Sequence, residues 1–350
     1  MEGIVMKSAA DNIAVLGAGS WGMALAKSFC ENGRRVRLWE FLADRAKKLA
    51  AERQDDAFLP GVTLAKDILI TSDIEEAVED AELVALVIPS HAMREVCGKL
   101  NSIRLAGKTI VSMAKGLENK TLMRMSEVIP DAIDEDLEKR VAVLSGPSHA
   151  EEVSVGLPTT VVVSSSELEV ARYVQRTVMT PRLRIYTNTD MIGVEMGGAL
   201  KNIIAIAAGV CDGLGFGDNT KAALMTRGLA EISRLGVAMG ANPLTFAGLS
   251  GMGDLIVTCT SRHSRNRNLG ERIGKGASLE QAMGQTVMVS EGVKTTLAAH
   301  ELAGRAGVEM PITEKVKAVL FDGEDPRTAV SALMERHAKS ELETDFLSLG

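Results

Sequence analysis

The chain has 350 residues and a net charge of −7, with 46% hydrophobic and 24% charged residues. Its length favours two domains, and the acidic balance argues against a nucleic-acid-binding protein. We expect a soluble, cytoplasmic protein without a membrane span, because we find no signal peptide and no apolar run near the roughly 18 residues that cross a bilayer. The four cysteines form no CxxC pair and the five histidines lack metal-ligand spacing, so we expect no metal site.

Short apolar runs alternate with helical segments in the first half of the chain. Such runs are typical of buried parallel strands, and their alternation with helices predicts a doubly wound, Rossmann-type α/β domain over residues 11–188. Helices are predicted near Trp21–Asn32 and Leu42–Glu52. The predicted strands are Asn12–Gly17, Arg35–Glu40, Asp67–Thr71, Glu82–Ser90, Lys108–Gly116, Val141–Pro147, Thr159–Ser165 and Leu183–Asn188.

Helical periodicity dominates the chain after about Asp190, and this part lacks a convincing strand. We therefore predict an all-α second domain over residues 189–340, which opens with the apolar helix "GGALKNIIAIAAG" at Gly197–Gly209. The later predicted helices are Thr220–Met239, Arg265–Lys275, Ser290–Ala306, Pro311–Phe321 and Pro326–Lys339.

The hexamer "GAGSWG" places Gly17, Gly19 and Gly22 in G-x-G-x-x-G spacing. It follows a predicted strand and opens a predicted helix, which is the context that a dinucleotide fingerprint requires. Gly17 permits the tight turn, Gly19 lets a pyrophosphate approach the backbone, and Gly22 allows the helix to pack on the strand. The N-terminus of the helix then faces the phosphates. The alternative is a merely glycine-rich turn.

Glu40 ends the second predicted strand, where an acidic residue would hydrogen-bond the adenosine ribose of a dinucleotide. Phe41 and Leu42 follow it, and Arg45 is the nearest arginine. A 2′-phosphate would be repelled by Glu40 and would lack a nearby partner. The sequence therefore favours NAD over NADP. The alternative is a solvated glutamate at a strand end.

Lys201 and Asn202 interrupt the apolar helix Gly197–Gly209. Lys201 shares its helix face only with small or apolar side chains, which leaves space above it and offers no intrahelical ion pair. A partly desolvated lysine loses affinity for its proton, which suits acid–base work. The alternative is a close helix–helix contact with a lysine that extends to solvent. The residues on this face are Gly197, Gly198, Ile204, Ala205 and Ala208.

Further charged residues gather in Gly248–Gly274. Asp254 lies among glycines and apolar residues, which indicates a buried carboxylate. Arginines at 262, 265 and 267 suit bidentate capture of a phosphate, and the helix that begins there adds N–H donors. The alternative is a solvated basic loop. Lys115 and the segment Gly146–His149, which contains Ser148, follow the ends of predicted strands, where open α/β sheets bind ligands.

Six segments occur in one order along the chain: "GAGSWGMALA", "SMAKGLE", "SGPSHAEEV", "GGALKNIIAIAAG", "GMGDLIVTCTSRHSRN" and "SEGVKT". Together they closely resemble the bacterial-type glycerol-3-phosphate dehydrogenases that use NAD(P), and the resemblance covers about residues 11–340. A single motif would be weak evidence, whereas six in order are highly specific. Many members of this family carry a His or Arg just after the second strand. Phe41 and Leu42 depart from that pattern, in agreement with the preference for NAD.

The resemblance implies reversible reduction of dihydroxyacetone phosphate, a phosphorylated triose, to sn-glycerol 3-phosphate for glycerophospholipid synthesis. It implies that Lys201 is the catalytic acid/base, that Asp254 lies beside it, and that Lys115 helps to orient it. Asn202 either touches the substrate or satisfies a buried backbone group. The other substrate contacts implied are Lys115, Gly146, Ser148, Ser264, Arg265 and Asn266, with Arg265 on the phosphate. The dinucleotide contacts implied are Ser20, Trp21, Ala150, Val289 and Glu291, with Lys115 and Arg265 also expected near the cofactor.

Two other functions are compatible with part of these features. One is another two-domain hydroxyacid dehydrogenase with a helical second domain, such as a 6-phosphogluconate or 3-hydroxyacyl-CoA enzyme, although "TCTSRHSRN" argues against both. The other is a non-catalytic dinucleotide sensor, which would keep the glycine fingerprint but need neither Lys201 nor Arg265. A homodimer is a further open possibility.

Overall fold

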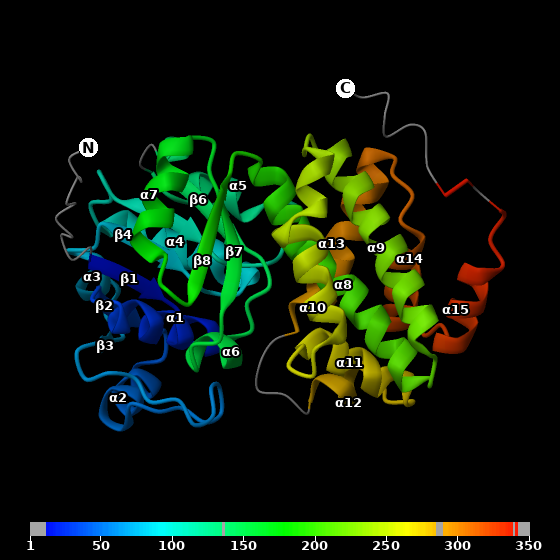
Figure 1. Cartoon of the computed structure of the whole chain (residues 1–350), viewed down its shortest axis with the longest axis horizontal. Coiled ribbons are helices and arrows are strands. Elements are labelled where there is room, and N and C mark those ends of the chain that lie inside the picture. Colours follow the sequence, from blue (N-terminus) through cyan, green and yellow to red (C-terminus); the bar gives the residue numbers. More distant parts are fainter. Residues whose placement is uncertain (1–11, 135–136, 285–289, 339, 342–350) are drawn as a thin grey trace. The chain divides into compact units, whose positions relative to one another are not determined.

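The computed structural model describes residues 12–134, 137–284, 290–338 and 340–341, and the chain divides into two compact units (Figure 1). The first unit comprises Met1–Glu118 and Met123–Glu195, and the second comprises Asn119–Leu122 and Met196–Gly350. The first unit thus extends past Asn188, where the domain boundary was predicted.

The described part of the first unit contains one eight-stranded sheet with the strand order β3-β2-β1-β4-β5-β6-β7-β8. The predicted doubly wound, Rossmann-type architecture is confirmed. Two predicted strands end four residues earlier than expected: β4 stops at Leu86, before Pro89, which lacks an N–H for the ladder, and β5 stops at Ser112. The strands are β1 Asn12–Leu16, β2 Arg35–Trp39, β3 Leu69–Thr71, β4 Leu83–Leu86, β5 Thr109–Ser112, β6 Val141–Ser145, β7 Thr159–Ser164 and β8 Leu183–Asn188.

One strand pair departs from the predicted run of parallel crossovers. β6 and β7 pair antiparallel, with Val143 opposite Ser164, whereas the other pairs are parallel. The helix between them, α6 (Ala150–Ser154), has five residues. A helix of that length rises only about 7 Å, less than half of the roughly 17 Å that a five-residue strand spans. It therefore cannot return the chain to the start of β6, and β7 runs back in the opposite direction.

Each face of the sheet packs against its own helices and its own hydrophobic core. Along β1, Ile13 and Val15 join one core cluster, and Ala14 and Leu16 join the other. This alternation follows the two-residue period of a strand and explains why the strands are apolar on both faces. Residues of α1, α2, α6 and α7 contribute to the first cluster, and residues of α3, α4 and α5 to the second (Figure 1). Their bounds are α1 Ser20–Glu31, α2 Ala43–Glu52, α3 Ile74–Val78, α4 Met93–Lys99, α5 Met125–Ala132 and α7 Leu168–Val178.

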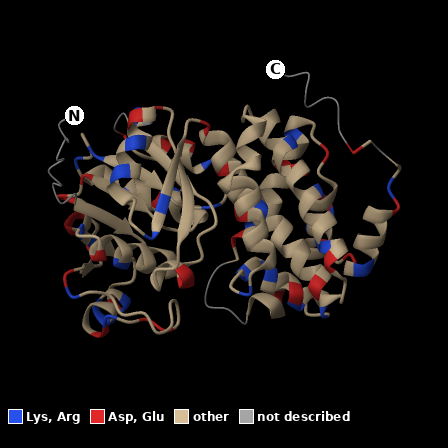
Figure 2. Cartoon of the chain, viewed as in Figure 1, with Lys and Arg blue, Asp and Glu red and all other residues tan. Residues whose placement is uncertain are grey.

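The described part of the second unit is helical and contains no strand, as predicted. Figure 2 shows acidic and basic residues interspersed over its helices. The last predicted helix is shorter than expected, since α15 ends at Met334. The helices are α8 Met191–Gly213, which begins in the first unit, α9 Asp218–Ala238, α10 Asp254–Thr260, α11 Arg265–Gly274, α12 Leu279–Met283, α13 Glu291–Ala306, α14 Pro311–Phe321 and α15 Pro326–Met334.

α8 corrects the expectation that the chain lacks an apolar run of membrane-spanning length. It has 23 residues and is apolar enough to cross a bilayer by length and composition. However, 94% of its most apolar window is buried inside the protein, as in the core helix of a soluble domain. Its apolar character is therefore explained by packing.

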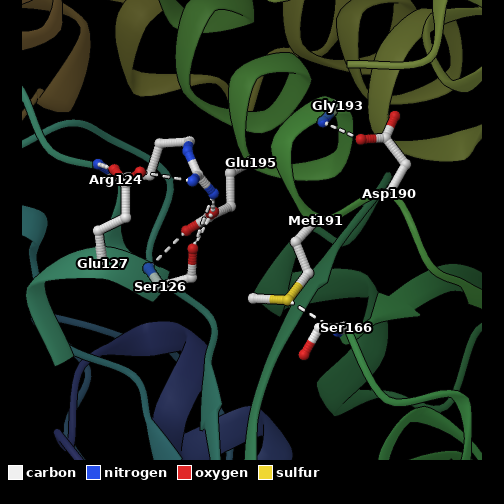
Figure 3. A network of polar contacts seen from close by, with 8 residues as sticks. All are labelled: Arg124, Ser126, Glu127, Ser166, Asp190, Met191, Gly193 and Glu195. Carbon is white, nitrogen blue, oxygen red and sulfur yellow. Dashed lines mark hydrogen bonds and ion pairs between the residues drawn. The ribbon is translucent and has the colours of Figure 1, made fainter. Parts of the chain in front are cut away.

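The first turns of α8 are fixed by a buried carboxylate. Glu195 accepts hydrogen bonds from the backbone N–H of Ser126 at 2.8 Å and from its hydroxyl at 2.6 Å, and it pairs with Arg124 at 2.7 Å (Figure 3). Asp190 caps the same helix by accepting from the N–H of Gly193. Burial raises the pKa of Glu195, although Arg124 and Ser126 oppose that shift. This network joins the start of α8 to the start of α5.

A second buried carboxylate links helices of the second unit. Glu231 on α9 accepts hydrogen bonds from the N–H groups of Ile312 at 2.6 Å and Thr313 at 3.2 Å, and so caps α14. Burial raises the pKa of Glu231 to about 7, although these N–H groups oppose the shift. The cap satisfies donors that a helix N-terminus otherwise leaves unpaired.

The glycines of α8 and α11 let the two helices approach with their backbones in contact. A Cβ on Gly209 would lie 1.9 Å from the carbonyl oxygen of Arg267, and one on Gly270 would lie 2.0 Å from that of Ile206. These contacts involve main-chain atoms, which cannot rotate away. The sequence "GGALKNIIAIAAG" therefore does encode a close helix–helix contact.

We predict that Gly270→Ala lowers the free energy of unfolding by roughly 3 kcal/mol, because the added methyl group overpacks a backbone contact. Gly304→Ala is the matched control, since Gly304 lies inside α13 and a Cβ there meets no atom within 4 Å. The control should gain about 0.5–1 kcal/mol from helix propensity. Urea denaturation of both variants measures the difference, and equal effects would refute the backbone contact.

Candidate active site

The glycine fingerprint adopts the geometry that a bound dinucleotide requires. Gly17 has φ +116°, and a Cβ there would lie 2.4 Å from the carbonyl oxygen of Val87. A Cβ on Gly22 would lie 1.8 Å from the carbonyl oxygen of Gly17, so only glycine lets α1 start this close to β1. A Cβ on Gly19, in contrast, would meet no atom within 4 Å. The loop is thus closed on its protein side and open where a pyrophosphate would approach the backbone.

Ser20 and Trp21 form the first turn of α1, and no side chain caps this helix. The Ser20 hydroxyl donates to the carbonyl oxygen of Phe58 at 2.5 Å, and Trp21 is half-buried against the core. Ala150, another predicted cofactor contact, is the first residue of α6. α6 and α1 pack against each other, so the structure brings Ala150 to the fingerprint helix.

Glu40 lies at the end of β2 as predicted, but its surroundings differ from the expectation. Arg45 Nη1 lies 2.5 Å from Glu40 Oε2, and the N–H of Leu42 donates to Oε1. The prediction that no cation lies nearby was wrong, because α2 begins at Ala43 and brings Arg45 back to the strand end. The Glu40 side chain is only 8% exposed, so it is not the solvated glutamate of the alternative interpretation.

The structure brings together three predicted substrate residues at the ends of β5 and β6. Lys115 Nζ donates to the carbonyl oxygen of Gly146 at 2.9 Å and contacts Ser148 Oγ at 3.4 Å. Gly146 has φ +133°, which a larger residue rarely adopts. The ammonium and hydroxyl groups therefore lie at the carboxyl edge of the sheet, where ligands of such folds bind.

The centre of the second unit's candidate site is a buried ion pair. Lys201 Nζ lies 2.5 Å from Asp254 Oδ1 and 2.7 Å from Thr258 Oγ1. Lys201 is 5% exposed and Asp254 1% exposed. Thr258 in turn donates to the carbonyl oxygen of Asp254 at 2.5 Å, which fixes the hydroxyl as an acceptor for the ammonium. Such a pair costs desolvation energy, so its retention in the core is a sign of function.

A π-helical segment, Leu249–Gly253, presents Asp254 to Lys201. π-helical turns are rare and frequent at functional sites. A Cβ on Gly197 would lie 2.6 Å from the carbonyl oxygen of Ser250, and one on Gly251 would lie 2.1 Å from that of Phe246. The expected space above Lys201 is therefore filled at Gly197 by the backbone of this segment. Gly197 and Gly251 therefore allow the close packing that positions the Asp254 carboxylate.

Asn202 belongs to a buried amide chain. Its Oδ1 accepts from Asn266 Nδ2 at 3.0 Å, and Asn266 Oδ1 accepts from the N–H of Gly292 at 3.1 Å. Ser264 is also buried, and it caps α11 by accepting from the N–H of Arg267. These polar residues hold α8, α11 and α13 together. The hydrogen bond to Asn266 gives Asn202 a structural task, whether or not it also touches substrate.

The three arginines near the start of α11 have different environments. Arg267 pairs with Asp212 at 2.6 Å and with Glu271, so it is structural. Arg265 and Arg262 are exposed, and Arg265 is the first residue of α11, beside the helix N-terminus. The solvated-loop alternative thus holds for Arg262.

Two further predicted cofactor contacts belong to the second half of the chain. Glu291 is the first residue of α13, and Val289 lies outside the described residues. Within the described ranges, we find no cluster of His, Cys, Asp or Glu able to hold a metal.

Sequence reasoning missed two groups of this site. Thr258 lies one helical turn after Asp254, and that i,i+4 spacing could have identified it as a third member. Asp55 pairs with Arg45 at 2.8 Å beside Glu40, and no local spacing indicates that contact.

The chain matches known proteins over nearly its whole length. Residues 12–171 match the family model of the NAD-dependent glycerol-3-phosphate dehydrogenase N-terminus, and residues 190–331 match that of the C-terminus. The glycerol-3-phosphate dehydrogenase [NAD(P)+] of Moorella thermoacetica is 55% identical, over 95% of this chain and 98% of that protein. That of Geobacillus thermodenitrificans is 53% identical, over 95% and 97%.

The fold comparison agrees with the sequence comparison. The crystal structure of glycerol-3-phosphate dehydrogenase from Coxiella burnetii is similar with a TM-score of 0.89 and 38% identity, and covers 93% of this chain and 99% of that one. Both predicted parts, the dinucleotide-binding fold and the helical unit, are included in that match. This chain belongs to the NAD-dependent glycerol-3-phosphate dehydrogenase family.

Proposed function

We propose that this chain is an oxidoreductase that interconverts dihydroxyacetone phosphate and sn-glycerol 3-phosphate with NAD or NADP. The observation that carries the proposal is the buried group of Lys201, Asp254 and Thr258 in a chain of this family. A non-catalytic dinucleotide sensor would have no need for a buried ammonium. The net charge of −7 and the burial of α8 support a cytoplasmic enzyme.

The dinucleotide would be held by the fingerprint loop of the first unit. The positive φ of Gly17 and the open space at Gly19 fit a pyrophosphate against the loop backbone. Ser20, Trp21 and Gly22 would offer the N-terminus of α1 to the phosphates, and Glu40 would face the adenosine ribose. Val289 and Glu291 would complete the set, as the resemblance implies. When bound, the cofactor supplies or accepts the hydride at C2 of the substrate.

Lys201 would move the proton of the reaction. In ketone reduction its ammonium donates a proton to the developing alkoxide, and in alcohol oxidation the neutral amine accepts that proton. Its charge also stabilises the oxyanion before transfer is complete. Asp254 would keep the side chain oriented, because its Oδ1 lies 2.5 Å from Lys201 Nζ in a buried setting.

The remaining residues would position the triose. Arg265, at the start of α11, would bind the phosphate with its planar guanidinium. Lys115 would orient the polar end of the substrate together with Ser148 Oγ, to which it already hydrogen-bonds. Asn266 and Asn202, joined at 3.0 Å, would line the same substrate side of α8 and α11.

The proposal predicts that purified enzyme oxidises NADH or NADPH in the presence of dihydroxyacetone phosphate. Initial rates at 340 nm measure this, and 6-phosphogluconate and a 3-ketoacyl-CoA serve as competing substrates. Turnover of only a competing substrate would favour another two-domain dehydrogenase. Binding of NADH without turnover of any of the three would favour the sensor. Light scattering of the same sample tests the homodimer.

A further inference from the structure

Arg45 connects two parts of the candidate dinucleotide site in the first unit. Its Nη1 pairs with Glu40 Oε2 at 2.5 Å, and its Nη2 donates to the carbonyl oxygen of Ala18 at 2.6 Å. Ala18 lies inside the glycine fingerprint, between Gly17 and Gly19. The guanidinium therefore bridges the acidic end of β2 and the loop that faces the pyrophosphate.

A second carboxylate occupies the remaining edge of this guanidinium. Arg45 Nε donates to Asp55 Oδ2 at 2.8 Å, and the guanidinium carbon lies 3.8 Å from the centre of the Phe58 ring. The side chains of Arg45 and Asp55 are each 18% exposed, so the network is largely withdrawn from solvent. All three donor nitrogens of Arg45 are thus engaged by protein groups.

The charges of this network favour a cofactor without a 2′-phosphate. One guanidinium faces two carboxylates, so these three side chains together carry a net charge of about −1 beside the expected position of the adenosine ribose. A 2′-phosphate carries nearly two negative charges at neutral pH. It would have to compete with two carboxylates for the guanidinium, and it would be repelled by both.

We propose that Arg45 and Asp55 are cofactor-specificity residues that act with Glu40. Asp55 and Glu40 mask the guanidinium, which is a latent 2′-phosphate partner, and the masked arginine makes the site select NAD(H) over NADP(H). The inference rests on the proposed dinucleotide function. Specificity through Glu40 alone would need no second residue. In this proposal Asp55, ten positions after Arg45, supplies one of the two negative charges that mask the guanidinium.

A purely structural task is the main competing explanation for Arg45. Its bond to Ala18 and its contact with Phe58 fix the loop, and such a task would affect both cofactors equally. The ratio of the two affinities separates the explanations, because a loop defect cancels in the ratio and a charge effect does not.

The test measures equilibrium binding of NADH and NADPH by the fluorescence of the reduced nicotinamide, without substrate or turnover. Asp55→Asn should lower the ratio of the NADPH to the NADH dissociation constant about tenfold, the effect of one charge at a partly exposed site. Arg45→Met should raise that ratio, since it leaves both carboxylates without their cation. Thermal melts confirm that each variant is folded.

Asp56→Asn is the matched control. Asp56 is exposed, neighbours Asp55 in sequence, and accepts from the N–H of Gly61 instead of pairing with Arg45. It removes the same charge and should leave the ratio unchanged. An unchanged ratio in Asp55→Asn, or an equal change in Asp56→Asn, would overturn the inference. If the unaltered protein bound neither dinucleotide, the proposed function itself would fail.

Discussion

Replacing Lys201 with methionine is expected to lower kcat with dihydroxyacetone phosphate by roughly 1,000-fold or more. Loss of a general acid typically costs a factor of about 100–10,000, and loss of the charge that stabilises the alkoxide adds to it. Binding of NADH should change little, because the proposed dinucleotide contacts near the fingerprint lie in the first unit. Initial rates and nicotinamide fluorescence measure the two effects separately.

The same change has a second expected result. It leaves Asp254, which is 1% exposed, as a buried carboxylate without its cation. Breaking a buried ion pair by removing one partner typically costs about 3–5 kcal/mol. The stability of Lys201→Met should therefore fall by a measurable amount in urea denaturation, and a simple loss of activity could be attributed to misfolding.

A double variant separates catalysis from folding. Lys201→Met combined with Asp254→Asn removes both charges, so much of the lost stability should return. Activity should not return, because no proton donor has been restored. Recovery of turnover in the double variant would mean that Lys201 acts mainly through charge balance. Near-normal kcat in the folded single variant would refute the acid/base assignment outright.

The sequence predicted those parts of the site that depend on local backbone geometry. Gly17, Gly19 and Gly22 act through their own turn, so a spacing rule identifies them, and the structure gives them the expected closed and open faces. The strands could be predicted equally well, because burial on both faces of a parallel sheet requires a continuous apolar run in the sequence. The length of such a run does not say where pairing stops, and for this reason β4 and β5 were predicted too long.

Contacts between distant segments were harder to predict. Lys201 and Asp254 are 53 residues apart, and only the fold brings α8 to α10. The small residues beside Lys201 indicated either a ligand space or a helix contact, and periodicity alone cannot distinguish the two. The structure shows a backbone contact at Gly197, together with a buried ion pair one turn later. The close helix contact is therefore present, whereas the space expected beside Gly197 is filled and Lys201 does not extend to solvent.

Arg45 illustrates the same limit on a shorter range. Its position five residues after Glu40 in the sequence does not indicate a contact. The turn into α2 reverses the chain, however, and places the guanidinium 2.5 Å from the carboxylate. Since the position of α2 depends on its packing against β3, a later segment of the chain, nothing within the turn itself predicts the pair.

The Arg265 side chain gives the second large expected effect. Arg265→Ala should raise the KM for dihydroxyacetone phosphate by about 30–100-fold, the typical loss of a charge-assisted, bidentate contact. The effect on kcat should be smaller, because the phosphate is bound in both the ground state and the transition state. Arg265→Lys should fall in between, since it keeps the charge but loses the planar fork.

Two controls make this prediction specific to phosphate binding. Arg262 is exposed and only three residues earlier, so Arg262→Ala removes the same charge from the loop that precedes α11 and should change KM less than about twofold. Dihydroxyacetone lacks the phosphate, and its slow reduction should be nearly equal in the unaltered enzyme and in Arg265→Ala. If Arg265→Ala impaired both substrates equally, the guanidinium would act on the fold of α11 or on the cofactor, and the phosphate would have to bind elsewhere, with Lys115 the next candidate.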